Sequence, residues 1–210
     1  MSRVRIISRP LPGSGGPVDR RAVPTGMNPM LTADFFARDA VTVAQELLGC
    51  TLWHGDAGGI IVETEAYTDD PASHAVLRGP RGQLMRETYG RLYVYLIYGM
   101  YYCLNFTTDT RDPGAVLIRA IAPTHGIESM QARTPRPMPV HELARGPGRL
   151  CRALGIGREH NGEQIGRRVC LQPRATAPPI ASSPRIGITQ GRDLLWRFFI
   201  PNEPSVSRFR

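Results

Sequence analysis

A run of tyrosines and aliphatic residues between Leu92 and Phe106 constrains the fold more strongly than any other part of the chain. The run holds five of the seven tyrosines of the protein and is interrupted by one glycine, Gly99. Aromatic and β-branched side chains favour strands, and a glycine between two such stretches favours a tight turn. The run therefore predicts a β-hairpin with strands over 92–98 and 101–106 and with Gly99 at its tip.

The tip of this hairpin carries two residues that the core does not explain. Packing between strands accounts for Tyr93 and Tyr102, but a large ring beside a glycine at a hairpin tip points toward solvent. We therefore expect Tyr98 to be exposed, with Met100 on the other side of the glycine. A wedge of this kind suits insertion between flat groups, such as the stacked bases of a nucleic acid.

The other segments predict strands grouped early in the chain, with helices interspersed but not strictly alternating. That arrangement favours a compact α+β domain over residues 31–210. Residues 1–30 are rich in arginine, proline and glycine, and we expect them to form a disordered tail. The expected strands cover 51–53, 59–67, 116–122, 185–189 and 195–200, and the expected helices cover 40–48, 127–133 and 147–154.

Every basic side chain of the protein is an arginine, and the chain contains no lysine. There are 26 basic and 18 acidic residues among 210, which gives a formal net charge of +8. A coding bias toward arginine explains the choice of residue but not the excess of charge. The excess favours a polyanionic partner, most simply a nucleic acid.

The composition also bears on location, metals and redox state. No apolar run approaches the ~18 residues that span a bilayer, and the N-terminus lacks the apolar centre of a secretory signal. The cysteines form no C-x-x-C pair, so a zinc site or a disulfide framework is not expected. We expect a cytoplasmic monomer with reduced thiols, without metal or other cofactor and without a membrane partner. The four cysteines are Cys50, Cys103, Cys151 and Cys170.

Two glutamates and a tyrosine occupy alternate positions in the apolar strand expected over 59–67. Because side chains alternate between the two faces of a strand, Glu63, Glu65 and Tyr67 share one face. One interpretation is an exposed face that carries a surface ion pair. The other is a general base held on a rigid strand, with Tyr67 in the wall of a pocket.

Three further polar residues are candidates for a functional site. His74 lies in an expected loop, where a lone histidine is more often structural than functional. Asn105 and Arg119 each lie in an apolar strand, where an unpaired polar group is costly. Either they satisfy carbonyl groups of the core or they orient a substrate, and the sequence leaves both readings open. No phosphate-binding loop, nucleophile elbow or metal-ligand spacing accompanies them.

Six strings follow one another along the sequence: 59–67 (GIIVETEAY), 72–74 (ASH), 92–100 (LYVYLIYGM), 116–120 (VLIRA), 144–156 (ARGPGRLCRALGI) and 184–188 (PRIGI). In order and spacing, they resemble the motifs of the alkyladenine DNA glycosylases, the mammalian type of 3-methyladenine DNA glycosylase. The resemblance covers roughly residue 34 to the end of the sequence. It implies a single mixed domain with a curved antiparallel sheet, a protruding hairpin, surrounding helices and no metal.

The resemblance implies an enzyme of DNA base-excision repair whose partner is damaged double-stranded DNA, associated with the nucleoid. Such an enzyme flips alkylated or deaminated purines out of the duplex and hydrolyses the N-glycosidic bond. The implied substrates are 3-methyladenine, 7-methylguanine, hypoxanthine and ethenoadenine. Because the chain has no lysine for a Schiff base, we expect a monofunctional enzyme without lyase activity.

By motif position, the resemblance implies roles for residues that act in chemistry and in duplex distortion. Glu65 corresponds to the general base that activates water. Arg119 corresponds to a residue that helps to hold the water and the flipped nucleotide. Tyr98 corresponds to the tip residue that fills the gap left in the duplex, and Met100 lies beside it as a second intercalating residue.

The resemblance also implies a pocket for the flipped base. Tyr67, His74 and Tyr95 correspond to its aromatic wall. Asn105 corresponds to a residue that discriminates against the purine amino group, and Ile186 to a backbone contact near the pocket. One departure concerns the loop over 75–90, where the family usually carries a T-P-R-N-x-x-M-F-like run. Here the asparagine is missing, so the resemblance assigns no contacts to that loop.

Two other function classes remain open from the residues alone. A glycoside hydrolase acting on sugars would use Glu63 and Glu65, although two carboxylates on one strand face are poorly placed to flank a bond from opposite sides. A nucleic-acid-binding module without activity would explain the charge and the hairpin tip, but not a glutamate in a pocket. Release of free base from alkylated DNA distinguishes these classes from a DNA glycosylase.

Overall fold

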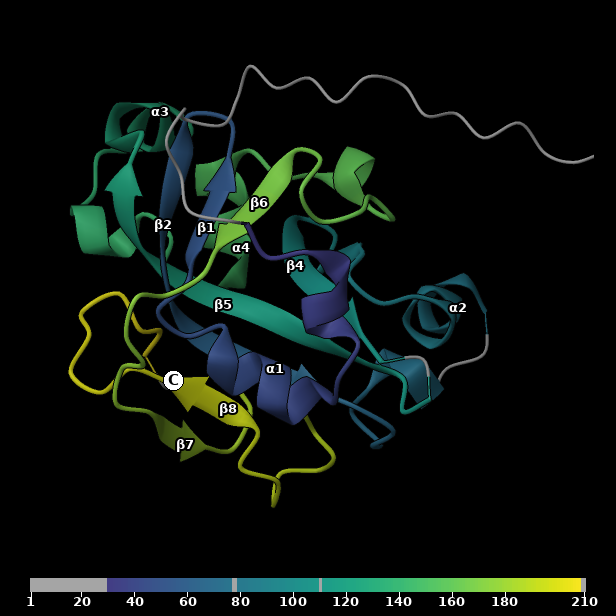
Figure 1. The fold of residues 1–210 in the computed structure, drawn as a ribbon. Helices are drawn as coiled ribbons and strands as arrows, with labels where there is room; N and C mark the ends of the chain where they lie inside the picture. Colours follow the sequence, from purple (N-terminus) through teal and green to yellow (C-terminus); the bar gives the residue numbers. More distant parts are fainter. Residues whose placement is uncertain (1–29, 77–78, 110, 209–210) are drawn as a thin grey trace, which may run out of the picture.

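One curled antiparallel sheet organises the chain (Figure 1). The computed structural model describes residues 30–76, 79–109 and 111–208, so the tail expected over 1–30 lies outside the described residues except for its last residue. The elements, in chain order, are η2 (Ala33–Phe36), α1 (Ala40–Glu46), β1 (Thr51–His54), β2 (Ala57–Tyr67), η3 (His74–Val76), α2 (Pro80–Glu87), β3 (Leu92–Ile97), β4 (Tyr101–Thr108), β5 (Gly114–His125), α3 (Ile127–Ala132), η4 (Val140–Glu142), α4 (Pro147–Leu154), η5 (Arg158–His160), β6 (Val169–Gln172), β7 (Ala181–Ser183) and β8 (Arg197–Phe199).

Strand β2 lies at the centre of the sheet and pairs with three strands along its two edges. The main strand order is β3-β4-β5-β2-β1-β6, with β5 along one edge of β2. On the other edge β1 pairs with the first part of β2 and β8 with residues 63–65, and β7 then pairs with β8. All of these pairings are antiparallel, which confirms the predicted α+β class with a curved antiparallel sheet.

Helices cover the sheet where the apolar side chains of β2 and β5 need partners. Helix α1 begins at its predicted N-cap, where the carboxylate of Asp39 accepts a hydrogen bond from the Thr42 N–H. It packs on β2 and β5, and the Thr64 hydroxyl of β2 donates to the carbonyl of Ala44 in α1. Since neighbouring side chains of a strand point to opposite faces, the glutamates on either side of Thr64 face away from α1.

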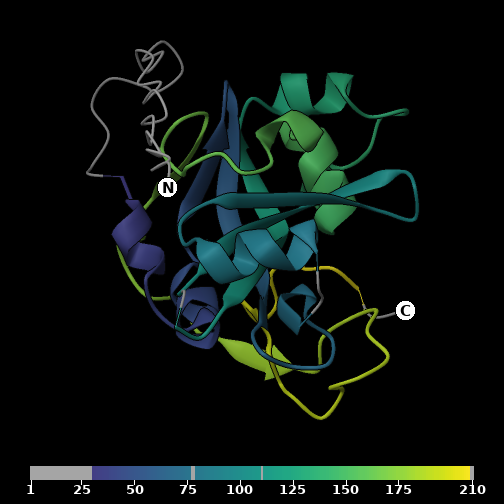
Figure 2. The same ribbon diagram turned by 90° about the vertical axis from the view of Figure 1, so that its right-hand side faces the viewer.

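The predicted hairpin is present and extends outward from the rest of the sheet, as the teal strands of Figure 2 show. Its turn is closed by a 3.2 Å hydrogen bond from the Met100 N–H to the Ile97 carbonyl. Both central residues have positive φ, 53° at Tyr98 and 70° at Gly99. Positive φ at both positions is the requirement of a type I′ turn, which matches the twist of paired strands.

Two predicted strands near the C-terminus need correction. Residues 185–189 form no strand, because the Arg185 side chain turns inward to bind Asp70 and the backbone N–H of Ile186 bonds a side chain. The strand of this region is β7, which ends before Arg185. The strand predicted over 195–200 is shorter than expected and is β8. Strand β6 and helix α2 were not predicted, since neither segment has a clear period in the sequence.

The four cysteines are buried and carry free thiols, as predicted. Burial raises the pKa of the Cys103 thiol to about 11, so the thiol keeps its proton near neutral pH. Over the described ranges, no group of three or more histidine, cysteine, aspartate or glutamate side chains is arranged to hold a metal ion. None of the helices in the same ranges is long and apolar enough to cross a membrane.

Candidate active site

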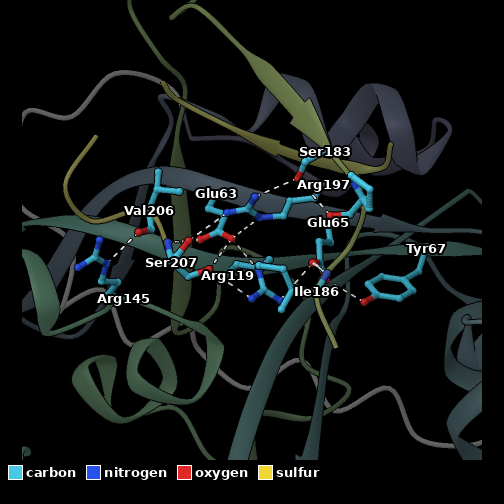
Figure 3. Close-up of polar contacts among 11 residues, drawn as sticks. Glu63, Glu65, Tyr67, Arg119, Arg145, Ser183, Ile186, Arg197, Val206 and Ser207 are labelled. Atoms are coloured by element: carbon cyan, nitrogen blue, oxygen red, sulfur yellow. Dashed lines mark hydrogen bonds and ion pairs between the residues drawn. The ribbon is translucent and has the colours of Figure 1, made fainter. Parts of the chain in front are cut away.

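Irregular pairing between β2 and β5 brings Arg119 beside both glutamates of β2. The register shifts twice between Ile61 and Thr64, so Arg119 falls opposite no single residue of β2. Bulges of this kind re-aim a side chain and are frequent next to active sites. The Arg119 guanidinium lies 2.8 Å from Glu63 through Nε and 3.2 Å from Glu65 through Nη1 (Figure 3).

Glu65 is fully buried, and two hydrogen bonds and one ion pair fix its carboxylate. Its Oε1 accepts a 2.7 Å hydrogen bond from the backbone N–H of Ile186 and also contacts Arg119. Its Oε2 accepts a 2.8 Å hydrogen bond from the Tyr67 hydroxyl. An ionised carboxylate offers about four lone-pair positions, so these partners leave one position on Oε2 for a further donor such as water.

Glu63 is also fully buried, and four hydrogen bonds hold its carboxylate. Its Oε1 accepts from Arg119 Nε at 2.8 Å, from Arg197 Nε at 2.7 Å and from the Ser207 hydroxyl at 2.7 Å. Its Oε2 accepts a 2.7 Å hydrogen bond from the Ser207 N–H. Burial by itself would raise the pKa of Glu63, but the two guanidinium groups and the bonds from Ser207 lower it below its usual value.

The two glutamates therefore share a face, as the strand period predicted, yet differ in what they can do. The interpretation of this face as an exposed surface is wrong, because both carboxylates are buried in an ion-pair cluster. Two guanidinium groups hold Glu63 in its ionised form, which makes it a poor proton acceptor. Of the two, Glu65 is the one with the capacity of a general base.

A cavity of about 440 Å³ opens in front of Glu65. Glu65 itself does not line it, but its three partners Tyr67, Ile186 and Arg119 do, so the carboxylate lies one layer behind the wall. The wall combines aromatic rings with arginines, which suits a flat ligand attached to an anionic backbone. It is formed by Tyr67, Ala72, Tyr95, Ile97, Tyr98, Tyr101, Cys103, Leu117, Arg119, Arg145, Gly146, Pro147, Gly148, Arg149, Arg152, Ile186, Gly187 and Ile188.

A second cavity of about 30 Å³ lies beyond Tyr67 and Tyr95, which line both cavities. His74 and Asn105 line the second cavity and not the first. The His74 Nδ1 lies 2.7 Å from the Tyr93 hydroxyl, and the Asn105 Nδ2 donates to the Tyr93 carbonyl at 3.0 Å. Asn105 thus satisfies a core carbonyl, which was one of its two possible roles, while its side chain still borders the cavity.

The loop over 75–90 contributes to this second cavity, although its motif departs from the family pattern. Helix α2 places Met85, which is fully buried, against Tyr93 and Ala115 in a small apolar cluster. Met85 also lines the second cavity. The contacts of the loop are therefore apolar at this position, while residues 77 and 78 lie outside the described part of the chain.

A buried ion pair holds the segment that brings Ile186 to Glu65. Arg185 makes two hydrogen bonds to Asp70, of 2.7 and 3.0 Å, and its guanidinium lies 4.7 Å from the centre of the Tyr67 ring. The burial of Tyr67, followed by the charge of Glu65, raises the pKa of its hydroxyl well above the usual value. Tyr67 is therefore a hydrogen-bond donor to Glu65 and not a phenolate.

Sequence reasoning missed the arginines at the rim of the main cavity. Arg149 and Arg152 lie three residues apart on α4 and share a face of the helix, a spacing that could have revealed them. Arg145 precedes the helix and lines the same rim. The start of α4 packs tightly on the hairpin, since a Cβ at Gly148 would lie 3.0 Å from the Tyr101 ring.

The hairpin tip matches its prediction in exposure. Tyr98 is 77% exposed and borders the mouth of the main cavity. Met100 is 65% exposed and lines neither of the two cavities described above. Of the residues proposed from sequence, Glu65, Arg119, Tyr67 and Ile186 are in direct contact, and the others border the cavities or, like Met100, the exposed tip.

Comparison with known proteins agrees with this geometry. Residues 34–204 match the family model described as methylpurine-DNA glycosylase. Relatives provisionally named 3-methyladenine DNA glycosylase occur in Rhodopseudomonas palustris (43% identical, covering 87% of this chain and 90% of the relative), in Rhizobium etli (48%, covering 83% and 87%) and in Methanoculleus marisnigri (44%, covering 85% and 98%). The chain therefore belongs to the methylpurine-DNA glycosylase family, as its sequence motifs predicted, and is a DNA glycosylase.

Proposed function

We propose that this protein excises alkylated or deaminated purines from double-stranded DNA by flipping the base into the main cavity and hydrolysing its N-glycosidic bond. The proposed substrates are 3-methyladenine, 7-methylguanine, hypoxanthine and ethenoadenine. The names of the relatives support the first of these. The single observation that carries the proposal is the buried Glu65, with one acceptor position left, behind a cavity walled by tyrosines and arginines.

Glu65 is the proposed general base. A water bound at the remaining position of Oε2 would give up a proton to Glu65 as it attacks the sugar carbon of the flipped nucleotide. General-base catalysis by a positioned carboxylate contributes ~10²–10⁴-fold. The Arg119 guanidinium, fixed at the other oxygen, would help to hold the water and the nucleotide.

Tyr67, His74 and Tyr95 would enclose the flipped base. The centre of the His74 ring lies 4.8 Å from that of the Tyr95 ring, and Tyr67 and Tyr95 each line both cavities. Alkylation at N3 or N7 gives the purine a positive charge, which the faces of aromatic rings attract. Stacking of about 1–3 kcal/mol per base offsets much of the cost of flipping.

Asn105 would select among bases, and the backbone N–H of Ile186 would hold the catalytic carboxylate in place. Asn105 borders the second cavity, where an exocyclic amino group of a normal purine would meet it.

The chain has no lysine that would form a Schiff base with the abasic sugar, so the proposed product is an intact strand with an abasic site. The proposed substrate implies that the protein binds DNA, and we propose that the protein acts as a monomer.

The alternative of a glycosidase acting on sugars is less well supported. Such an enzyme needs a second carboxylate that is free to give or take a proton. Glu63 is the only other glutamate on this face of β2, and Arg119, Arg197 and the two hydrogen bonds from Ser207 hold its carboxylate in the ionised form.

The test is release of free base from a duplex that carries one ethenoadenine or hypoxanthine, with enzyme in excess over DNA. We expect Glu65→Gln to lower the excision rate constant by ~10²–10⁴-fold, because the amide cannot take a proton. Its affinity for a duplex with an abasic site should stay close to that of the wild type. Glu46→Gln, which alters a carboxylate of α1 paired with Arg38, is the matched control and should excise at the wild-type rate.

If Glu65→Gln excises as fast as the wild type, Glu65 is not the base. If the wild type itself releases no base from any damaged duplex, the proposed activity is wrong. Strand cleavage at the abasic site by the purified protein would contradict the monofunctional part of the proposal.

A further inference from the structure

Each nitrogen of the Arg119 guanidinium contacts a different residue. Nε donates to Glu63 at 2.8 Å, Nη2 donates to the Ser207 hydroxyl at 3.3 Å, and Nη1 lies 3.2 Å from Glu65. Figure 3 shows the guanidinium between the two carboxylates, with Ser207 on the side of Glu63. The orientation of Arg119 toward Glu65 is therefore set largely by groups on its other side.

Glu63 is itself held by two segments far from β2 in sequence. Arg197 of β8 donates to Glu63 through Nε at 2.7 Å, and to the Ser183 hydroxyl at 3.0 Å and the Ser207 carbonyl at 3.1 Å through its other nitrogens. Ser207 contributes both its N–H and its hydroxyl to Glu63. The segment after β8 thus closes over the back of the cluster.

The geometry matters because an arginine prefers to bind a carboxylate with two nitrogens at once. Such a fork between Arg119 and Glu65 would engage both oxygens of Glu65. It would fill the one acceptor position of Oε2 that is left beside the Tyr67 bond. In the structure Glu63 occupies Nε and Ser207 occupies Nη2, so only Nη1 reaches Glu65.

We propose that Glu63, Arg197 and Ser207 are positioning residues that hold Arg119 in a single-nitrogen contact and thereby keep Glu65 able to accept a proton from water. The inference rests on the proposed function, in which Glu65 is the base. The charges of the cluster balance, since two carboxylates face two guanidinium groups. Loss of Glu63 leaves the Arg119 charge with Glu65 as its nearest carboxylate partner, which favours the two-nitrogen pair.

The experiment measures excision from an ethenoadenine duplex over a range of enzyme concentrations in excess of DNA. It yields a maximal rate constant and a half-saturating concentration, which separate chemistry from binding. We expect Glu63→Gln to lower the maximal rate constant by roughly 10- to 100-fold, as misplacement of a catalytic group does, with the half-saturating concentration within about twofold of the wild type. Ser207→Ala removes only the hydroxyl and should cause a smaller loss in the same direction.

The matched control is Thr64→Val. Thr64 is fully buried, lies between the two glutamates, and bonds the α1 carbonyl of Ala44 on the opposite face of β2. This variant should lower the unfolding midpoint without changing the maximal rate constant. A purely structural role for Glu63 predicts that both variants lose rate in proportion to their loss of stability.

A double-mutant cycle identifies the route through Arg119. If Glu63 acts by holding Arg119, Glu63→Gln should have less than a twofold effect in the Arg119→Met background. An equal loss in both backgrounds, or a wild-type rate constant in both Glu63→Gln and Ser207→Ala, overturns this inference while the proposed function stands. Ser207→Ala carries the test if Glu63→Gln does not fold. Absence of base release by the wild type overturns the proposed function instead.

Discussion

Replacing Tyr98 with asparagine removes the ring at the hairpin tip while keeping the backbone conformation of the turn. Tyr98 has a φ of 53°, in the left-handed region that few bulky residues adopt. Asparagine tolerates this region, and asparagine followed by glycine is a favoured pair for a type I′ turn. Left-handed backbone costs ~1–2 kcal/mol per ordinary residue. We therefore expect Tyr98→Asn to fold as stably as the wild type or slightly more so.

The ring makes little contact in the free protein, because it is 77% exposed. Its contribution should therefore be measurable only in the complex with DNA. When a nucleotide leaves the duplex its neighbours lose stacking, and a ring inserted in the gap restores about 1–3 kcal/mol. Tyr98→Asn should weaken binding to damaged duplex by roughly 5- to 150-fold. The excision step should be unaltered once the base is flipped, since Tyr98 lies at the exposed hairpin tip and is not one of the partners of Glu65.

The assay follows the fluorescence of 2-aminopurine next to the lesion, which reports unstacking, together with affinity and single-turnover excision on the same duplex. Tyr89→Asn is the matched control, because Tyr89 is a 39% exposed tyrosine outside the hairpin. We expect a smaller fluorescence change for Tyr98→Asn and wild-type behaviour for Tyr89→Asn. Wild-type affinity and fluorescence in Tyr98→Asn would refute the reasoning. Normal flipping with failed excision would place Tyr98 in the chemistry.

Two further predictions concern charge. DNA affinity should fall with rising salt, with a slope of about −0.9 in log K against log salt for each neutralised phosphate. In a salt titration, Arg149→Ala should reduce the size of that slope by about 1. A slope of zero for the wild type would reject phosphate contacts. Asp70→Asn should cost about 3–5 kcal/mol of stability at pH 7, measured by denaturant unfolding. Burial by itself would raise the pKa of Asp70, but hydrogen bonds from Arg185 and the backbone lower it below its usual value in the folded protein. The contribution of this ion pair to stability is therefore complete above the unfolded pKa of about 4 and is lost as the pH falls through the folded value. The difference between Asp70→Asn and the wild type should therefore shrink toward pH 3, and a constant difference would contradict it.

The parts of the fold that were predictable are those that depend on neighbouring residues. The hairpin followed from aromatic strands around Gly99, and α1 followed from an N-cap at Asp39. Helix α4 was predicted over the residues it occupies, because Pro147 suits a first turn and Gly155 a left-handed end, and Gly155 has a φ of 67°. In each case the signal lies within one turn or one strand of the feature that it determines.

The parts that were not predictable depend on residues far apart in sequence. Arg185 looked like a strand residue, but it is buried against Asp70, 115 positions earlier. The N–H of Ser207 reaches Glu63 across 144 positions. The pairing irregularities that aim Arg119 at the glutamates arise from the register of β2 against β5, which no local pattern specifies.

The two glutamates of β2 illustrate which part of the site could be predicted from the sequence and which part could not. Strand alternation places Glu63 and Glu65 on one face, and residue type makes both of them acids, so the residues by themselves leave them equivalent, and only the family resemblance singles out Glu65. What distinguishes them in the structure is where their partners lie. Glu63 is held by Arg197 and Ser207, neither of which lines the main cavity, whereas all three partners of Glu65 line it. A base must lie next to its substrate, which favours Glu65. Glu63 is not idle, however, because the arginine that it holds is the same one that contacts Glu65. A substitution at Glu63 should therefore affect the chemistry of Glu65 even though Glu63 never touches the substrate.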